Sequence, residues 1–383
     1  MLNTSKIELS QSALASNIKF IRKIAGKKTK VSTVVKGNAY GHGIEQIVPM
    51  AEKCGVDHFS VFSADEAYRC EKVAHPETEI LIMGMIEDAA IPWAVANGID
   101  FYVFTMERLK VAIKAAERTK TKAKIHVEVE TGMNRTGFTS EELEDVFNII
   151  KDNRDKVELK AVTTHFAGAE SIANYHRIKS QLKIYKKTCC RFEENDLKPE
   201  IYHSACSAAA IRYPKARMDM IRVGVLNYGF WPNMETFIDY TSDKKNYKDP
   251  LLRVIRWVSK VMSVKDVKPG KFIGYGTSFL ASKKMKIATV PVGYGHGFAR
   301  SLSNHGRVLV NGERVSVIGI VNMNLITIDV TDVPQTKIGD EVVLIGDQGD
   351  KSISVSSFSD LSDQLNYELL TRLPESIPRF PVD

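Results

Sequence analysis

The sequence lacks the cysteine pattern of a disulfide or zinc framework. Its 383 residues include five cysteines, none of them spaced as CxxC. An odd number scattered over a chain of this length argues against structural disulfides. This usage fits a reducing compartment, so we expect a cytoplasmic protein without a metal site.

Long apolar runs are also missing. The N-terminal stretch MLNTSKIELSQSALASN has neither the basic start nor the continuous apolar core of a signal peptide. No segment approaches the roughly 20 apolar residues of a membrane-spanning helix. We therefore expect no membrane partner.

Clusters of basic residues with interleaved aromatics, which nucleic-acid binding requires, are absent as well. The net charge is +7, but lysines and arginines alternate with acidic residues along the helical stretches. We expect no nucleic-acid partner. With 44% hydrophobic and 26% charged residues, the composition is globular, and the length suggests two or three domains.

Short β-rich runs recur through the first part of the chain. Segments with helical spacing lie between them, such as SADEAYRCEKVA after the second run and SEELEDVFNIIKDN after the fifth. Eight strands that alternate with helices predict an α/β fold with a (β/α)8 TIM-type barrel, because parallel strands need crossover connections and eight units can close. The eight runs are 31–35, 58–62, 79–83, 100–104, 124–129, 159–164, 200–205 and 220–225.

The pattern changes near residues 241–250, TSDKKNYKDP, which we interpret as a linker. Beyond it, strand-like runs are separated by turn signals, including the hairpin dipeptide Asn311-Gly312. The sequence therefore predicts a barrel domain over residues 1–245 and a mainly antiparallel β domain over 246–383, with a short terminal helix near SSFSDLSDQLNYELLTRL.

Polar residues stand directly after several β runs, where the active site of such a barrel is built. Any one of them alone is more simply explained as a structural residue at a strand end. Their joint placement at one end of the barrel favours a functional interpretation. They are Lys36, Glu128, Glu130, His165, His203 and Arg222.

Lys36 follows a buried strand, in the run VVKGNAYGHG. Burial disfavours the charged ammonium and lowers its pKa, and a neutral amine is the nucleophile that forms a Schiff base with an aldehyde cofactor. The neighbouring glycines suit a loop that passes close to a ligand, and Tyr40 can offer a hydroxyl to an anion. The alternative is a lysine that extends from an ordinary loop into solvent.

Phosphate sites of such barrels often lie after the seventh and eighth strands. Here those loops contain CSAAA and RVGVLNYG, in which Ser207 supplies a hydroxyl and Gly224 and Val225 supply backbone N–H groups. A lysine together with a phosphate cradle in one mouth favours pyridoxal phosphate over a free sugar phosphate.

Taken together, these motifs resemble the alanine racemase family over nearly the whole chain. VVKGNAYGHG resembles the family's pyridoxal-lysine segment, and TGMNRTGF, TTHFA, HSACSAA, IRVGVLNYG, GYGT, PVGYGHGFAR, VNMN and NYELL follow in the family's order. The resemblance implies an N-terminal barrel, a C-terminal β domain and a head-to-tail homodimer whose active sites use residues of both subunits.

The resemblance also implies the reaction, the interconversion of L-alanine and D-alanine through an aldimine with pyridoxal 5'-phosphate, which would supply D-alanine for peptidoglycan. Lys36 would hold the cofactor, and Tyr275 of the partner subunit would be the opposing base. The resemblance also places a group of residues at the cofactor phosphate, namely Tyr40, Ser207, Gly224, Val225 and Tyr367. It implies that Arg222 contacts the ring nitrogen, that His165 packs against the ring and that Arg135 lies near the phenolic oxygen. The backbone of Met323 would contact the substrate carboxylate.

The chemistry accounts for these residue types. An arginine can only donate, so Arg222 would keep the ring nitrogen unprotonated, weaken the electron sink and favour reprotonation at Cα over side reactions. His203 can orient Arg222 if its ring is neutral and accepts a hydrogen bond. A phenol with a pKa near 10 needs a neighbour to act as a base, and His165 is the expected partner of Tyr275.

The chain departs from the family pattern at several positions. Glu128 stands where many members carry a lysine, often carbamylated, so we predict that no carbamate is needed and that Glu128 pairs with Arg135. Cys206, His296 and Asn324 replace asparagine, aspartate and aspartate near the substrate channel. These changes are as consistent with neutral drift as with a racemase of broader specificity acting on serine, lysine or arginine.

Two other classes compete with the racemase interpretation. Pyridoxal-dependent decarboxylases of basic amino acids share the barrel and the β domain, but their usual ring-nitrogen partner is acidic, and Arg222 argues against them. A non-catalytic pyridoxal-phosphate carrier is a single barrel domain, so the β domain with Tyr275 and Met323 argues against that alternative.

Overall fold

The computed structural model describes residues 3–242, 248–359 and 366–383. Their contacts form two compact units, which we call the barrel unit and the sheet unit. The barrel unit comprises residues 13–37 and 47–252, and the sheet unit comprises residues 1–12, 38–46 and 253–383. Among the described residues, none of the helices has the length and apolar character needed to cross a bilayer.

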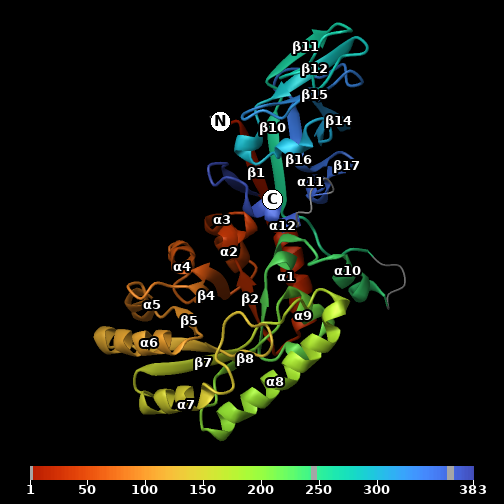
Figure 1. Cartoon of the computed structure of the whole chain (residues 1–383). Coiled ribbons are helices and arrows are strands. Elements are labelled where there is room, and N and C mark those ends of the chain that lie inside the picture. Colours follow the sequence, from red (N-terminus) through yellow and green to blue (C-terminus); the bar gives the residue numbers. More distant parts are fainter. Residues whose placement is uncertain (1–2, 243–247, 360–365) are drawn as a thin grey trace. The chain divides into compact units, whose positions relative to one another are not determined.

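Eight parallel strands close into a barrel, and helices such as α6 (Met106–Thr119), α7 (Leu143–Asp152) and α8 (Tyr175–Glu194) lie outside the ring (Figure 1). Each strand coincides with one of the eight predicted runs, which confirms the predicted fold class. The strands are β2 (Lys30–Val34), β3 (His58–Ser63), β4 (Glu79–Met85), β5 (Asp100–Val103), β6 (Ala123–Glu128), β7 (Val157–Thr163), β8 (Ile201–His203) and β9 (Met220–Val223).

Burial on both faces explains why the barrel strands are almost continuously apolar. All residues of β5 and β9 are buried, because helices cover the outer face while side chains fill the interior. The covering helices show the matching 3.6-residue period, as in α7, whose buried positions are Leu143, Val146, Phe147 and Ile150. The other helices between the strands are α1 (Gln11–Ala25), α3 (Ile44–Glu52), α4 (Ala64–Glu71), α5 (Ile91–Ala96), α9 (Ser207–Arg212) and α10 (Met234–Thr241).

The sheet unit contains a ten-stranded sheet whose path is β11-β12-β15-β14-β13-β16-β10-β1-β18, with β17 paired to β16. Its pairs are antiparallel except for β1 with β18, which confirms the mainly antiparallel prediction. The strands are β1 (Ser5–Ser10), β10 (Ile255–Lys260), β11 (Ser263–Val267), β12 (Met285–Val290), β13 (Arg307–Val310), β14 (Glu313–Ile318), β15 (Ile326–Asp329), β16 (Glu341–Gln348), β17 (Lys351–Ile353) and β18 (Arg379–Val382).

The predicted hairpin at Asn311-Gly312 is confirmed. Val310 pairs with Glu313, so the loop has two residues, and both have positive φ, 50° at Asn311 and 76° at Gly312. Positive φ at both loop residues is typical of a type I′ turn, which matches the twist of the flanking strands.

The two units do not follow a single cut of the chain, whereas the predicted domain limits, 1–245 and 246–383, assume one. Strand β1 joins the sheet between β10 and β18, with Ile7 and Leu9 fully buried, and residues 38–46 also belong to the sheet unit. The alternation of Ser5–Ser10 fits a strand with one buried face, but its partners β10 and β18 lie about 250 and 370 residues away, beyond any local signal.

Parts of two other predictions lie outside the described residues. These are the centre of the expected linker, at 243–247, and the centre of the expected terminal helix, at 360–365. On either side of the second gap the chain is helical, in α11 (Ser356–Ser359) and α12 (Asn366–Thr371).

The short helix α2 (Lys36–Tyr40) is left-handed from its second residue. Gly37 has φ of 62°, and Asn38, Ala39 and Tyr40 have φ of 52° to 53°. For non-glycine residues this conformation costs about 1 to 2 kcal/mol each. Hydrogen bonds hold it, because the ring Nδ1 of His42 lies 3.0 Å from the carbonyl oxygens of both Ala39 and Tyr40.

Within the sheet unit, the segment after this turn packs closely against the C-terminal part of the chain. The buried guanidinium of Arg379 donates to the carbonyl of Gly41 at 2.9 Å and to that of Ile377 at 2.7 Å. Gly41 has φ of 80°, and a Cβ there would lie 1.9 Å from the carbonyl oxygen of Leu370. Only glycine permits this approach.

We expect Gly41→Ala to lower the free energy of unfolding by about 3 kcal/mol or more, because it combines a backbone clash with positive φ. Gly270→Ala is the matched control, since Gly270 also has positive φ, 76°, but open space around its Cβ position. It should cost only about 1 to 2 kcal/mol. Thermal unfolding of both variants measures the difference, and equal losses would contradict the close packing at Gly41.

Candidate active site

Lys36 stands just past the C-terminal end of β2, at the mouth of the barrel unit. The adjoining backbone is held by Glu66 of α4, whose carboxylate accepts from Gly37 N–H at 2.6 Å and from Phe62 N–H at 2.9 Å. The side chain of Lys36 remains exposed to solvent, yet the dense surroundings of the mouth lower the pKa of its ammonium, and Arg135 adds repulsion. A lowered pKa brings Lys36 closer to the neutral, nucleophilic form.

Arg222 lies on β9 and is 4% exposed. Its Nη1 donates to His203 Nδ1 and, at 3.1 Å, to the hydroxyl of Thr163, while Nη2 donates to the carbonyl of Thr164 at 3.0 Å. The predicted contact between His203 and Arg222 is therefore present. Among the described hydrogen bonds, none uses the Nε–H of Arg222, so one donor of this buried guanidinium is left for a ligand.

His165 follows β7 and lies beside Arg222, with Nδ1 3.5 Å from Nη2. Burial, together with the positive charges of Arg222, Arg135 and Lys36, lowers the pKa of His165 to about 3. The ring is therefore neutral at physiological pH. Arg222, Arg135 and Lys36 all lie close enough to the His165 ring to disfavour its protonated form.

Glu128, the last residue of β6, is the carboxylate of this region and is 3% exposed. Burial raises the pKa of Glu128, while a hydrogen bond with Thr136 and the charges of Arg135 and Arg222 oppose that rise. The expected attraction to Arg135 is present, but no ion pair within 4 Å joins these two described residues. The structure therefore shows no direct pairing of Glu128 with Arg135, and Arg135 acts on Glu128 through its charge.

The loop that carries Arg135 is shaped by Glu130, whose carboxylate accepts backbone hydrogen bonds from Gly132, from Met133 at 2.7 Å and from Asn134 at 2.8 Å. We expected Glu130 to be a polar residue of the mouth but not a loop anchor. Glu66 was missed altogether, although an acidic residue in the first turn of a helix after a strand was a usable signal.

The three predicted phosphate residues of the barrel unit lie together. Ser207 begins α9, and its hydroxyl accepts from Gly224 N–H at 3.1 Å. Val225 follows Gly224 and begins the 3-10 turn η3 (Val225–Tyr228). Because the Gly224 N–H already donates to the Ser207 oxygen, the donors that this group offers to an anion are the Ser207 O–H and the Val225 N–H.

Four predicted site residues belong to the sheet unit. Tyr40 and Tyr367 contact each other, with ring centroids 6.2 Å apart in an edge-to-face arrangement. Tyr275 lies between β11 and β12 and is 71% exposed, and Met323 is 57% exposed. No described hydrogen bond uses the Tyr275 hydroxyl or the Met323 N–H, so both are open to contacts outside the sheet unit.

The three departures from the family pattern have different surroundings. His296 has a structural role, because its Nδ1 accepts from Gly293 N–H at 3.2 Å and closes the turn Tyr294–His296. Cys206 precedes α9 and lies close enough to Lys36 to affect the pKa of the lysine. Asn324 is exposed.

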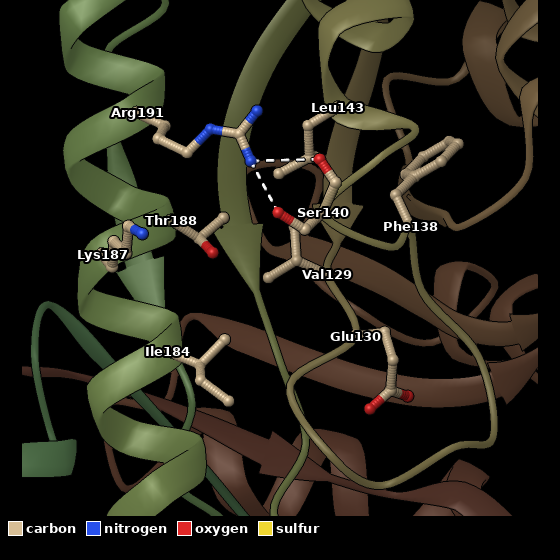
Figure 2. A pocket seen from close by; sticks show the side chains of 9 residues that line it. All are labelled: Val129, Glu130, Phe138, Ser140, Leu143, Ile184, Lys187, Thr188 and Arg191. Carbon is tan, nitrogen blue, oxygen red and sulfur yellow. Dashed lines mark hydrogen bonds between the residues drawn. The ribbon is translucent and has the colours of Figure 1, made fainter.

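A separate cavity of about 460 Å³ lies on the outer side of the barrel unit, between α8 and the chain around Val129 and Ser140 (Figure 2). Arg191 of α8 donates to the hydroxyl of Ser140 at 2.9 Å and to its carbonyl at 3.1 Å across this space. Glu130 lines this cavity, but Lys36 and Tyr275, the two predicted catalytic residues, do not.

At the mouth, the barrel unit combines a lysine of lowered pKa, two arginines, a neutral histidine and an anion cradle. Its cationic character and the unused Nε–H of Arg222 fit a planar anionic ligand with a ring acceptor. Pyridoxal phosphate has both features and an aldehyde for Lys36, whereas a simple sugar phosphate lacks the ring acceptor.

Comparison with known proteins gives matches over most of the chain. A model of the alanine racemase N-terminal domain matches residues 9–232, and a model of the alanine racemase C-terminal domain matches residues 254–381. Alanine racemase 1 of Caldanaerobacter subterraneus subsp. tengcongensis is 33% identical over 376 residues, which cover 98% of this chain and 94% of that protein.

Solved structures show the same architecture. Alanine racemase of Clostridium difficile 630 has a TM-score of 0.90 at 27% identity, and the match covers 100% of this chain and 96% of that one. Alanine racemase of Bacillus anthracis, solved with bound L-Ala-P, has a TM-score of 0.89 at 28% identity and the same coverage.

The depressed pKa of His165 predicts acid sensitivity. Between about pH 3 and its ordinary pKa of about 6.5, the unfolded chain binds a proton that the folded chain does not. The contribution of His165 to the free energy of unfolding is therefore fully present above about pH 6.5. It falls on acidification by up to about 1.4 kcal/mol per pH unit. We expect His165→Asn to make this fall shallower.

Unfolding midpoints measured between pH 7 and pH 4.5 test this expectation. His75→Asn is the control, because the His75 side chain is 78% exposed. If the curves of His165→Asn and the unmodified protein run parallel, His165 is not held neutral by its surroundings.

Proposed function

Because this chain belongs to the alanine racemase family, we propose that it is an isomerase that interconverts L-alanine and D-alanine. The observation that carries the proposal is the barrel mouth, where Lys36, with its lowered pKa, lies among Arg135, His165 and Arg222. The Bacillus anthracis relative with bound L-Ala-P supports a small amino acid as substrate.

We propose pyridoxal phosphate as the cofactor, since its features match the residues present. Lys36 would bond to its aldehyde, the group of Ser207, Gly224 and Val225 would hold its phosphate, and Arg222 would donate to its ring nitrogen through the unused Nε–H. Tyr40 and Tyr367 of the sheet unit would complete the phosphate contacts. When bound, this cofactor withdraws electrons from Cα and so acidifies the α-proton.

Inversion requires one base on each face of Cα, since a single base returns the proton to the face it came from. Lys36 would move the α-proton of D-alanine. Tyr275 of a second copy of the chain would move the α-proton of L-alanine, which makes the proposed enzyme a homodimer. The neutral ring of His165 can donate to the phenolate of Tyr275, and the Met323 N–H would bind the substrate carboxylate.

Arg222 would limit the reaction to racemisation. A guanidinium does not give up its proton to the ring nitrogen, so negative charge stays near Cα and is quenched there by reprotonation. An acidic partner would favour other outcomes, including decarboxylation. The product D-alanine would supply peptidoglycan synthesis. Cys206, close to Lys36, is the departure most able to change side-chain preference.

The direct test is a racemisation screen of the cofactor-loaded enzyme with alanine, serine, lysine and arginine in both enantiomers. We expect alanine to be the best substrate. A release of carbon dioxide without racemisation would contradict the proposal, and equal rates with all four would replace it with a broad-specificity racemase.

Tyr275→Phe separates the two bases. In deuterium oxide, the variant should still exchange the α-proton of D-alanine through Lys36, while conversion to L-alanine falls by about 10²- to 10⁴-fold. Lys36→Ala should lose both exchange and the aldehyde-linked absorbance. The control is Tyr68→Phe on the outer helix α4, where Tyr68 is 48% exposed. Full racemisation by Tyr275→Phe would exclude its role as a base.

Glu128 should replace a carbamate charge, so removal of bicarbonate should leave activity unchanged. Glu128→Gln and Arg135→Gln should each weaken binding of pyridoxal phosphate. The double variant should show a coupling of about 0.5 kcal/mol or more, because the two charges interact through the mouth. A coupling of zero in the measured affinities would mean that Glu128 does not act on Arg135.

A further inference from the structure

The contact between Arg222 and His203 continues as a chain of buried groups across the barrel interior. His203 Nε2 lies 3.0 Å from His126 Nδ1, and His126 Nε2 lies 3.0 Å from Asp100 Oδ2. The four residues are between 0% and 4% exposed and come from β5, β6, β8 and β9. Asp100 begins β5, at the barrel end opposite the mouth.

The direction of every hydrogen bond in this chain follows from its last member. An ionised carboxylate only accepts, so Asp100 requires a proton on His126 Nε2. A neutral His126 then accepts at Nδ1, which requires a proton on His203 Nε2. A neutral His203 accepts at Nδ1, and this atom meets Nη1 of Arg222, which can only donate.

The charge states of the chain support this assignment. Burial raises the pKa of Asp100, but the hydrogen bond to His126 and nearby positive charges lower it overall, so the carboxylate is ionised. Burial, with the adjacent positive charge of Arg222, lowers the pKa of His203 well below its ordinary value. A protonated His203 would also point a second N–H at Arg222.

Arg222 has a particular need for this arrangement. No carboxylate lies within ion-pair distance of its guanidinium in the part of the chain that the structure describes. A buried charge without a partner is costly, and polarised hydrogen-bond networks are one way to satisfy it. Asp100 provides the negative charge at a distance. It polarises the ring of His126, which in turn polarises the ring of His203 and makes His203 Nδ1 a stronger acceptor.

We propose that Asp100 and His126 are positioning residues of the enzyme, which fix the proton positions on His203 so that Arg222 always meets an acceptor. This inference rests on the proposed function, because its catalytic consequence is the orientation of Arg222 toward the cofactor ring. Neither residue touches the substrate. Their effect is carried through His203.

Asp100→Asn is the sharpest variant, because it keeps the shape but replaces an obligatory acceptor with a group that can also donate. If the amide donates to His126 Nε2, the proton of His126 moves to Nδ1 and that of His203 moves to Nδ1. Two donors, His203 Nδ1–H and Arg222 Nη1–H, then face each other. The variant therefore loses the single proton arrangement while its packing is retained.

The ring nitrogens report this directly. ¹⁵N NMR of the full-length protein labelled in histidine distinguishes protonated from unprotonated Nδ1 and Nε2, with resonances assigned by His126→Gln and His203→Gln. We expect both rings to be neutral with the proton on Nε2, with pyridoxal phosphate bound and after its removal. In Asp100→Asn, at least His203 should gain population protonated at Nδ1.

Glu79→Gln is the matched control, because Glu79 is a carboxylate at the same end of the barrel that pairs with Lys30 at 2.5 Å and lies outside the chain. It should leave both proton arrangements unchanged. For Asp100→Asn, kcat for alanine should fall about tenfold, the loss of roughly one charge-assisted hydrogen bond, with a larger effect on kcat than on KM.

The outcomes separate the two proposals. Two results would overturn the positioning role alone in a protein that racemises alanine. One is a proton on Nδ1 of His126 or His203, and the other is an Asp100→Asn variant that keeps both Nε2 protons and full kcat. A protein with the expected proton positions, lost in Asp100→Asn, supports the chain as a proton-fixing device. If that same protein fails to racemise alanine, the racemase assignment alone is overturned.

Discussion

The burial of the Arg222 guanidinium without a neighbouring carboxylate constrains much of the barrel. Its Nη groups need acceptors, which are supplied by Thr163, by the carbonyl of Thr164 and by a histidine that must stay neutral. Burial, together with this positive charge, lowers the pKa of His165, and Arg222 also contributes to the lowered pKa of Lys36, where burial is again the largest cause. The buried arginine therefore constrains both its hydrogen-bond partners and the charge states of its neighbours.

The barrel was predictable because each strand is buried on both faces and so leaves an apolar run between helical segments. The boundaries of the sheet unit were harder to predict from the sequence. The alternation of Ser5–Ser10 predicts a half-buried strand, but its pairing with β10 and β18 depends on residues at the other end of the sequence. Residues 38–46 join the sheet unit through contacts of Gly41 and Arg379, which no local pattern encodes.

At the site, Lys36, His165 and Arg222 could be predicted from their positions near strand ends, because a parallel barrel brings these ends together at one mouth. Of the residues that hold these groups, His203 was predicted, whereas Glu66, His126 and Asp100 were not. His126 stands inside the run KIHVEV and Asp100 opens the run DFYVF, and a polar residue directed into a barrel has meaning only through its partner on another strand. The expected direct pairing of Glu128 with Arg135 is absent from the ion pairs of the described residues, and Arg135 acts on Glu128 through its charge.

The assignment of residues 1–12, 38–46 and 253–383 to one unit bears on the order in which the protein is made. Strand β1 precedes the barrel unit in the sequence, whereas its parallel neighbour β18 follows it. The left-handed turn after Lys36 likewise waits for Leu370 and Arg379. The sheet unit is therefore completed only after the whole barrel unit has been synthesised, and chaperones acting before that point meet a barrel whose Lys36 loop still lacks its partners.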